Sequence, residues 1–91
     1  MQCVVYFTTE MATGTGTMWN CSRGGVRMDS ETSLACGCVL KLFVMLPEVP
    51  HGIIVEQALV CWSRGREVGL EIQTIDPQDA ARLQEFIMAC V

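Results

Sequence analysis

The chain has 91 residues, of which 51% are hydrophobic and 18% charged, so a folded globular protein is expected and a disordered one is excluded. The length suits one modest core, which predicts a single domain over residues 1–91. A formal net charge of −4, with only six Lys and Arg residues, makes nucleic-acid binding an unfavoured function. No stretch approaches the roughly 20 apolar residues of a membrane-spanning helix, so no membrane span is expected.

Patterns with a period of two residues predict short strands in the first half of the chain. Residues 3–7 (CVVYF) are β-branched and aromatic, and residues 25–29 alternate between apolar and polar side chains. Between them, TGTGT at 13–17 predicts a loop that leads into a short strand around MWNC. After a connection at 30–37, the continuous apolar run 38–46 predicts a strand that is covered on most sides.

A turn rich in Pro and Gly at 46–52 precedes the next elements. Residues 53–62 predict a strand, and their drifting pattern indicates a bulge or a twist. Residues 63–67 predict a polar hairpin loop that contains a glycine. Residues 68–75 alternate again and predict the last strand.

A helix over about residues 77–90 closes the chain. Asp76 suits the N-cap, and Pro77 suits the first helical position. Apolar residues then recur every three or four positions, at Ala80, Leu83, Phe86 or Ile87, and Cys90. Five or six antiparallel strands within about residues 3–75, followed by one helix, predict a small, mainly β barrel with a helical lid.

The cysteines are even in number and lie at positions 3, 21, 36, 38, 61 and 90. Most sit within apolar runs, which favours reduced thiols that pack as small buried hydrophobic residues. Zinc ligands and disulfides remain as alternatives, although the C-G-C spacing at 36–38 is too tight for a usual zinc knuckle. The opening MQCVVYFTTE is too short an apolar run for a secretory signal, so a cytoplasmic protein is expected.

The stretch NCSRGG at 20–25 is typical of a tight turn, because Asn and Ser bond nearby backbone groups and Gly accepts a positive φ. It also fits the [D/N]-x-S-x-x-G motif of the PilZ family. The strand GVRM after the motif, the strand that ends in VCW, and VGLEI followed by DPQD occur in that family's order. From about residue 3 to residue 86, the chain therefore resembles a PilZ domain.

The resemblance implies a six-stranded antiparallel barrel with a C-terminal helix, of a family in which many members are bacterial receptors for cyclic di-GMP. It further implies that Asn20 contacts a guanine base and that Ser22 hydrogen-bonds nearby ligand atoms. Gly25 would allow the backbone to approach the ligand closely. These three residues are candidate ligand positions, with cyclic di-GMP as the possible ligand and with no other cofactor or metal expected.

The family's second motif, R-x-x-x-R ahead of the first strand, has no counterpart here, because no arginine precedes Arg23. Arg23 and Arg27 have the same spacing but follow the other motif, so they are included only as the nearest candidate arginines. Two arginines paired with phosphates provide both charge and geometry. The interpretation is therefore a regulatory or adaptor domain that acts through an unidentified protein partner and binds cyclic di-GMP weakly or not at all.

Two alternatives remain. The first is a working cyclic di-GMP receptor that uses Asn20, Ser22 and Gly25 with Arg23, Arg27 or arginines further upstream. The second, more distant one is a small barrel that binds single-stranded nucleic acid by stacking bases on its tryptophans at 19 and 62. An enzyme is not expected, because the chain has one histidine and no base close to Ser22 in sequence.

Overall fold

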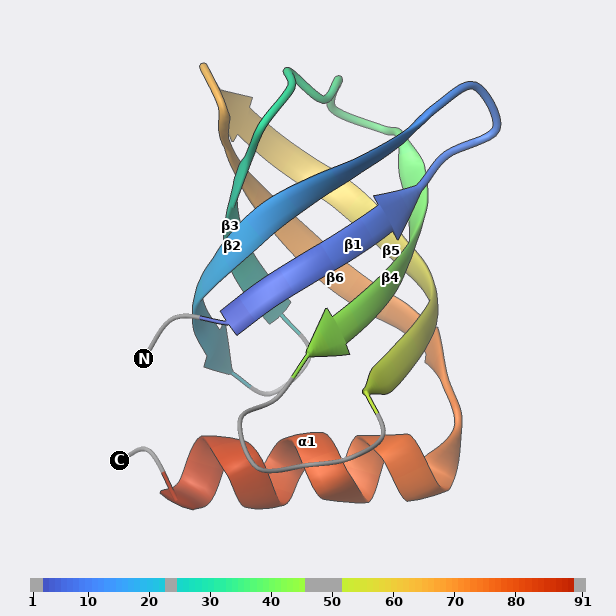
Figure 1. The fold of residues 1–91 in the computed structure, drawn as a ribbon, viewed down its shortest axis with the longest axis vertical. Coiled ribbons are helices and arrows are strands. Elements are labelled where there is room, and N and C mark those ends of the chain that lie inside the picture. Colours follow the sequence, from blue (N-terminus) through green and yellow to red (C-terminus); the bar gives the residue numbers. More distant parts are fainter. Residues whose placement is uncertain (1–2, 23–24, 46–51, 90–91) are drawn as a thin grey trace.

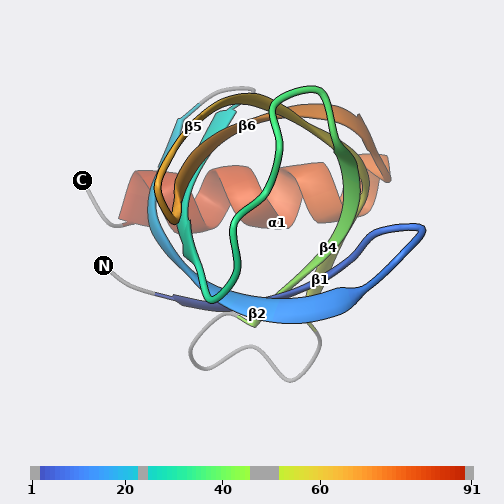
Figure 2. The same ribbon diagram turned by 90° about the horizontal axis from the view of Figure 1, so that it is seen from above.

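A computed structural model describes residues 3–22, 25–45 and 52–89, including all of their side chains except those of 20–22 and 86–89. Six strands and one helix are found in these residues. They are β1 (Cys3–Thr8), β2 (Thr13–Ser22), β3 (Gly25–Ser30), β4 (Val39–Met45), β5 (Ile53–Arg64), β6 (Glu67–Ile75) and α1 (Pro77–Ala89). The antiparallel strands close into a barrel in the order β1-β2-β3-β6-β5-β4 (Figure 1, Figure 2). The predicted mainly β barrel with a C-terminal helix is confirmed.

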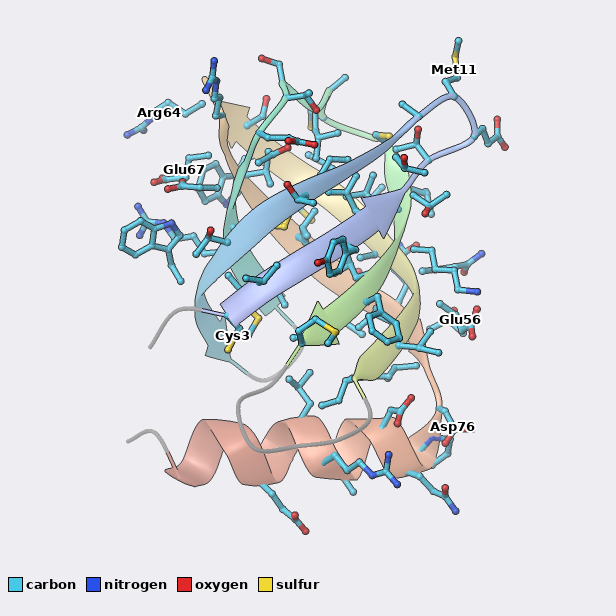
Figure 3. The ribbon with its side chains drawn as sticks, in the orientation of Figure 1. Cys3, Met11, Glu56, Arg64, Glu67 and Asp76 are labelled. Atoms are coloured by element: carbon cyan, nitrogen blue, oxygen red, sulfur yellow. The ribbon has the colours of Figure 1, made fainter. Side chains whose placement is uncertain are left out.

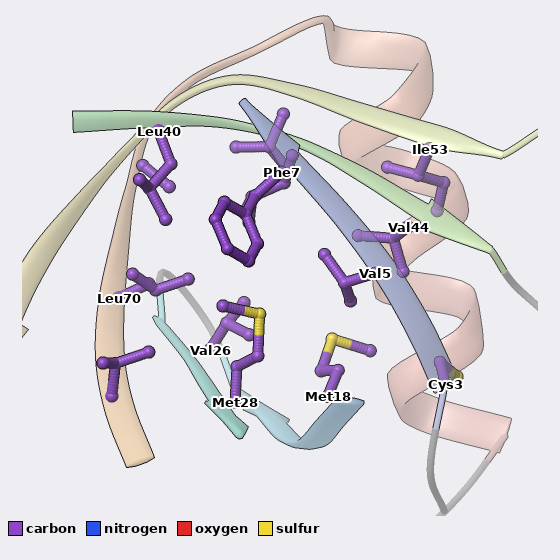
Figure 4. Close-up of a cluster of buried hydrophobic side chains, with 14 of the residues drawn as sticks. Cys3, Val5, Phe7, Met18, Val26, Met28, Leu40, Val44, Ile53 and Leu70 are labelled. Atoms are coloured by element: carbon purple, nitrogen blue, oxygen red, sulfur yellow. The ribbon is translucent and has the colours of Figure 1, made fainter. Parts of the chain in front are cut away.

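The core is the inside of the barrel. Along β1 and β4, buried and exposed side chains alternate strictly, so each strand contributes one face to the core. Figure 4 shows the ring of Phe7 in the middle of the barrel, with Met28 and Val26 from the facing wall directed towards it. Burial of these apolar faces is the main force that closes the sheet.

The TGTGT segment is part of β2, so the predicted loop at 13–17 is wrong. Gly14 pairs with Phe7, and Gly16 pairs with Val5, so both glycines occupy positions on the core side. A Cβ at Gly14 would lie 2.5 Å from the Phe7 ring, and one at Gly16 would lie 2.6 Å from the Asp29 carbonyl oxygen. The two glycines therefore leave room for a large ring and a close backbone, while the threonines take the outer positions.

The strand predicted at 38–46 is found at 39–45, but the expectation that it is covered on most sides is wrong. In β4, Leu40, Leu42 and Val44 are buried, but the residues between them face outward. Phe43 is 38% exposed and Met45 39% exposed on that outer face. The run looks continuous because apolar residues occupy both faces of the strand, not because both faces are covered.

The hairpin between β5 and β6 is tighter than predicted, since Arg64 and Glu67 already pair across it. Gly65 at its tip has a φ of +62°, which a glycine adopts without a Cβ penalty. β5 itself has irregular pairing with β6 at three places, which confirms the predicted bulge or twist. Such bulges bend a strand and change where its side chains point.

The helix α1 lies across one end of the barrel (Figure 1, Figure 2). The Asp76 side chain caps it by accepting the backbone N–H of Gln78 at 2.8 Å, as the N-cap prediction requires. Asp79 accepts the backbone N–H of Ile54 at 3.3 Å, which attaches the helix to the start of β5. Leu83 is buried against the barrel as predicted, whereas the side chains of Phe86 and Ile87 lie outside the described part.

Candidate functional site

The stretch 20–25 spans the end of β2 and the start of β3. Asn20 pairs with Arg27, and Ser22 pairs with Gly25, so the two strands run together in register up to this point. Arg23 and Gly24 lie outside the described residues. Gly25 is paired on both sides, with Ser22 of β2 and Glu71 of β6, and the irregularity of the β2–β3 pairing falls between Met18 and Asn20.

The pairing continues from β3 to β6 and from β6 to β5, so residues of these strands form a row of neighbours around the barrel. Arg27 pairs with Gly69 of β6, and Gly69 pairs with Trp62 of β5. Asn20, at the other end of the row, belongs to β2. Two pairs of consecutive strands that are far apart in the sequence, β2–β3 and β5–β6, therefore bring an amide-bearing residue, an arginine, a glycine and a tryptophan into one line around the barrel.

The indole of Trp62 occupies the space that a side chain at position 69 would fill, so its position requires a glycine there. A Cβ at Gly69 would collide with the Trp62 ring, at Nε1 and the two carbons bonded to it. The pairing shifts between Val60 and Trp62, so Cys61 is an extra residue that places Trp62 opposite the glycine. A glycine inside a strand often marks such a close approach, and that signal was present in VGLEI.

A hollow of about 230 Å³ opens on the outside of the barrel at this row. It is lined by Gly25, Val26, Arg27, Cys61, Trp62, Gly69 and Leu70. The predicted residues Gly25 and Arg27 are among these. Asn20 and Ser22 are placed beside them by register alone, since their side chains are not described. Sequence reasoning did not identify Gly69, and it gave Trp62 only as a stacking platform in the nucleic-acid alternative.

The charge around the hollow is mixed. The Arg27 guanidinium donates to a carboxylate oxygen of Glu67 at 2.8 Å, and its central carbon lies 6.0 Å from the centre of the Trp62 ring. Glu67 is labelled beside the upper end of β6 in Figure 3. A second acid, Glu71, pairs with Gly25 in the register and is exposed. Arg27 thus has an acidic partner, and a second carboxylate stands on the same stretch of sheet.

This arrangement suits a planar ring better than a multiply charged anion. A tryptophan beside a glycine offers a flat surface on which a purine could stack. A guanidinium could bind one phosphate, but Arg27 is the only cation among the residues that line the hollow in the described part of the chain. The hollow is therefore a small site on the barrel wall, in which Glu67 partly neutralises the charge of Arg27.

A second exposed feature lies on the outer face of β1 and β4. Val4 pairs with Met45, and Tyr6 pairs with Phe43. Their exposed fractions are 49%, 39%, 50% and 38%, in that order. We call these four residues the β1–β4 apolar face. Figure 3 shows side chains projecting from these strands away from the barrel interior.

Neither a metal centre nor a membrane helix is found in residues 3–22, 25–45 and 52–89. No group of three or more His, Cys, Asp or Glu side chains there is arranged to hold a metal ion. The only helix of this part is too short and too polar to cross a bilayer. Cys3 is buried as predicted, but Cys36 and Cys61 are exposed, so the expectation of buried thiols is wrong for those two.

A comparison with known families identifies the family of this chain. The family model described as the PilZ domain matches residues 1–89, which is nearly the whole chain. No curated protein matches the sequence.

Proposed function

The chain belongs to the PilZ domain family, a family of bacterial regulatory domains related to cyclic di-GMP signalling, and from this membership we propose a more specific function. We propose that it is a cytoplasmic adaptor without enzymatic activity, in which residues 1–91 form one domain that acts by contacting another protein. Cyclic di-GMP binds it weakly or not at all. The observation that carries the proposal is the ion pair between Arg27 and Glu67 at the rim of the hollow.

The ligand would carry two negative charges into a site that already has its own carboxylates. To bind a phosphate, Arg27 must leave Glu67, and exposed pairs of this kind contribute roughly 0.2–1 kcal/mol. Glu67 and Glu71 then stay close to the phosphate and repel it. The net charge of −4 adds a weak long-range repulsion instead of steering the ligand in.

The contribution of a paired arginine clamp shows how much affinity is at issue. A hydrogen bond to a charged group contributes roughly 1.5–3 kcal/mol, and a clamp of two arginines makes several. A receptor with a micromolar Kd binds with about −8 kcal/mol, so a loss of about 4 kcal/mol makes it millimolar. No arginine lies between Met1 and Arg23 to supply such a clamp within this sequence.

The alternative is a working receptor, and the hollow itself favours it. The indole of Trp62 on Gly69 offers a stacking surface, and Arg27 stands next to it. In that case Asn20, Ser22 and Gly25 hold the ligand with Arg23, Arg27 or arginines upstream of Met1. The two candidates share the site and differ in affinity.

Calorimetric titration with cyclic di-GMP separates them. The adaptor proposal predicts no saturation below about 100 μM ligand, whereas a submicromolar Kd would overturn it. The variant Glu67→Gln, which frees Arg27 without changing the size of the side chain, should tighten binding by up to about fivefold. The matched control Glu56→Gln alters an acid that pairs with Lys41 at 3.6 Å and should change nothing.

The protein-contact half of the proposal is supported by the β1–β4 apolar face. Its four adjacent apolar side chains are 38–50% exposed, and contiguous apolar patches on the surface of a monomer are often functional. Its test is a quantitative pull-down with the double variant Tyr6→Lys, Phe43→Lys beside a control, Thr13→Lys, at another exposed strand position. Partners retained by the wild type and the control, but lost with the double variant, support the proposal; equal retention contradicts it.

A further inference from the structure

The connection between β3 and β4 runs beside β5 and is held there by backbone hydrogen bonds. Gly37 N–H donates to the carbonyl of Val60 at 2.8 Å, and Val60 N–H donates to the carbonyl of Cys38 at 2.9 Å. Gly37 has a φ of +92°, and Cys38 N–H closes a turn onto the Ala35 carbonyl at 3.1 Å. Gly37 and Cys38 therefore both lie opposite the single residue Val60. This is the arrangement of a β-bulge whose first residue is a glycine in the left-handed region.

This pairing determines which residues come next to each other. Because Gly37 and Cys38 share Val60, the preceding residue, Cys36, lies against Cys61. The thiol of Cys36 indeed donates to the Cys61 carbonyl oxygen at 3.2 Å. Both cysteines are exposed free thiols. Two cysteines from segments that are distant in the sequence are thus neighbours on the surface.

The contact made by Cys36 suits a bridge between them. Its sulfur lies 3.2 Å from the Cys61 carbonyl oxygen, and disulfides join residues whose Cα atoms are roughly 4.4–6.8 Å apart. Among the described cysteines, Cys3 is 4% exposed inside the barrel, and the thiol of Cys38 is directed at the carbonyl of its own neighbour Val39, at 4.0 Å. The thiol of Cys61 donates to the Leu59 carbonyl at 3.6 Å, so it must rotate away from that oxygen to reach Cys36.

We propose that Cys36 and Cys61 are an oxidation site, and that a hydroperoxide converts them into an intramolecular disulfide. One thiolate attacks the peroxide and becomes a sulfenic acid, and the peroxide is reduced to an alcohol or water. The second thiol then attacks that sulfur, the S–S bond forms, and a water leaves. Two thiols lose two electrons and two protons in total, and the peroxide takes up both.

The bond would tie the β3–β4 connection to the wall of the hollow. Cys61 lines the hollow next to Trp62, so oxidation at this pair adjoins the candidate ligand site. The bond also closes a loop of about 25 residues, which restricts the unfolded chain. We expect the oxidised protein to melt on the order of 10 °C higher than the reduced one, and a reductant should reverse the shift.

Peptide mapping tests the pairing directly. Dilute protein is treated with one equivalent of hydrogen peroxide, remaining thiols are alkylated, and the chain is digested with trypsin without reduction. The bridge should link peptide 28–41 to peptide 42–64. The link and the rise in melting temperature should disappear in Cys36→Ser and in Cys61→Ser, and both should persist in the matched control Cys38→Ser.

Three outcomes would overturn the proposal. They are alkylation of both thiols after a tenfold excess of peroxide, a link that survives in Cys36→Ser, and sulfinic acid at Cys61 without any cross-link. None of these readouts depends on cyclic di-GMP or on a partner protein. The exposed serine variants keep the backbone bonds of Gly37 and Val60, so they should fold as the wild type does.

Discussion

Truncation of Leu83 to alanine tests how firmly α1 is packed on the barrel. Leu83 is 5% exposed, and it is the one helix residue buried to this degree among the described side chains of α1. Full burial of a leucine contributes about 1.5–3 kcal/mol, and the cavity left by its removal adds to the loss. We therefore expect Leu83→Ala to lower the free energy of unfolding by about 3 kcal/mol. For a domain of this size, that is a large fraction of a total of roughly 5–14 kcal/mol.

Urea unfolding followed by far-UV circular dichroism measures this loss. The midpoint should fall while the m-value stays the same, because the same surface is exposed on unfolding. Arg82→Ala is the matched control, since this neighbouring residue is exposed and its ion pair with Asp79 is long, at 3.6 Å. A loss below 1 kcal/mol in Leu83→Ala, equal to that of the control, would refute the reasoning and indicate a helix that is only loosely attached.

Three further substitutions test single features of the fold. Gly16→Ala should cost about 1–3 kcal/mol in urea unfolding, because its Cβ would meet the Asp29 carbonyl oxygen at 2.6 Å; an unchanged midpoint would contradict the close approach. Asp76→Ala removes the helix cap and should cost about 1 kcal/mol, whereas Asp76→Asn should retain most of it. Gly69→Ala should displace the Trp62 indole into water and shift its fluorescence to longer wavelength; an unshifted spectrum would argue against that placement.

Much of the fold could be predicted because the strands that carry it have clear local signals. Periodicity and end signals predict the succession of strands along the chain, the Asp76 cap and the burial of Leu83. The first half of β2 was missed because its core side carries Gly14 and Gly16, which have no side chain to signal burial. Gly14 makes room for Phe7 of β1, and Gly16 makes room for the Asp29 backbone of β3, and a local pattern does not show a fit between different strands.

The candidate site was predictable only in part, for a similar reason. The motif around Gly25 is local, and it lies at the hollow. The contribution of Trp62 depends on a bulge at Cys61 and on the gap left by Gly69 in the next strand. Glu67, the acid that pairs with Arg27, lies 40 positions further along the chain. No sequence window contains these partners together.

The most direct test of the central claim compares the wild type with a grafted protein by calorimetry. The graft adds an R-x-x-x-R segment ahead of Cys3 and leaves the remaining chain unchanged. If the chain carries the part of a cyclic di-GMP site that surrounds Gly25 and Arg27, the wild type should bind at best weakly and the graft should reach a micromolar Kd, a gain of at least tenfold. A folded graft that still binds no better than the wild type would show that the stretch 20–25 is only a turn. Submicromolar binding by the wild type would show instead that no clamp is needed.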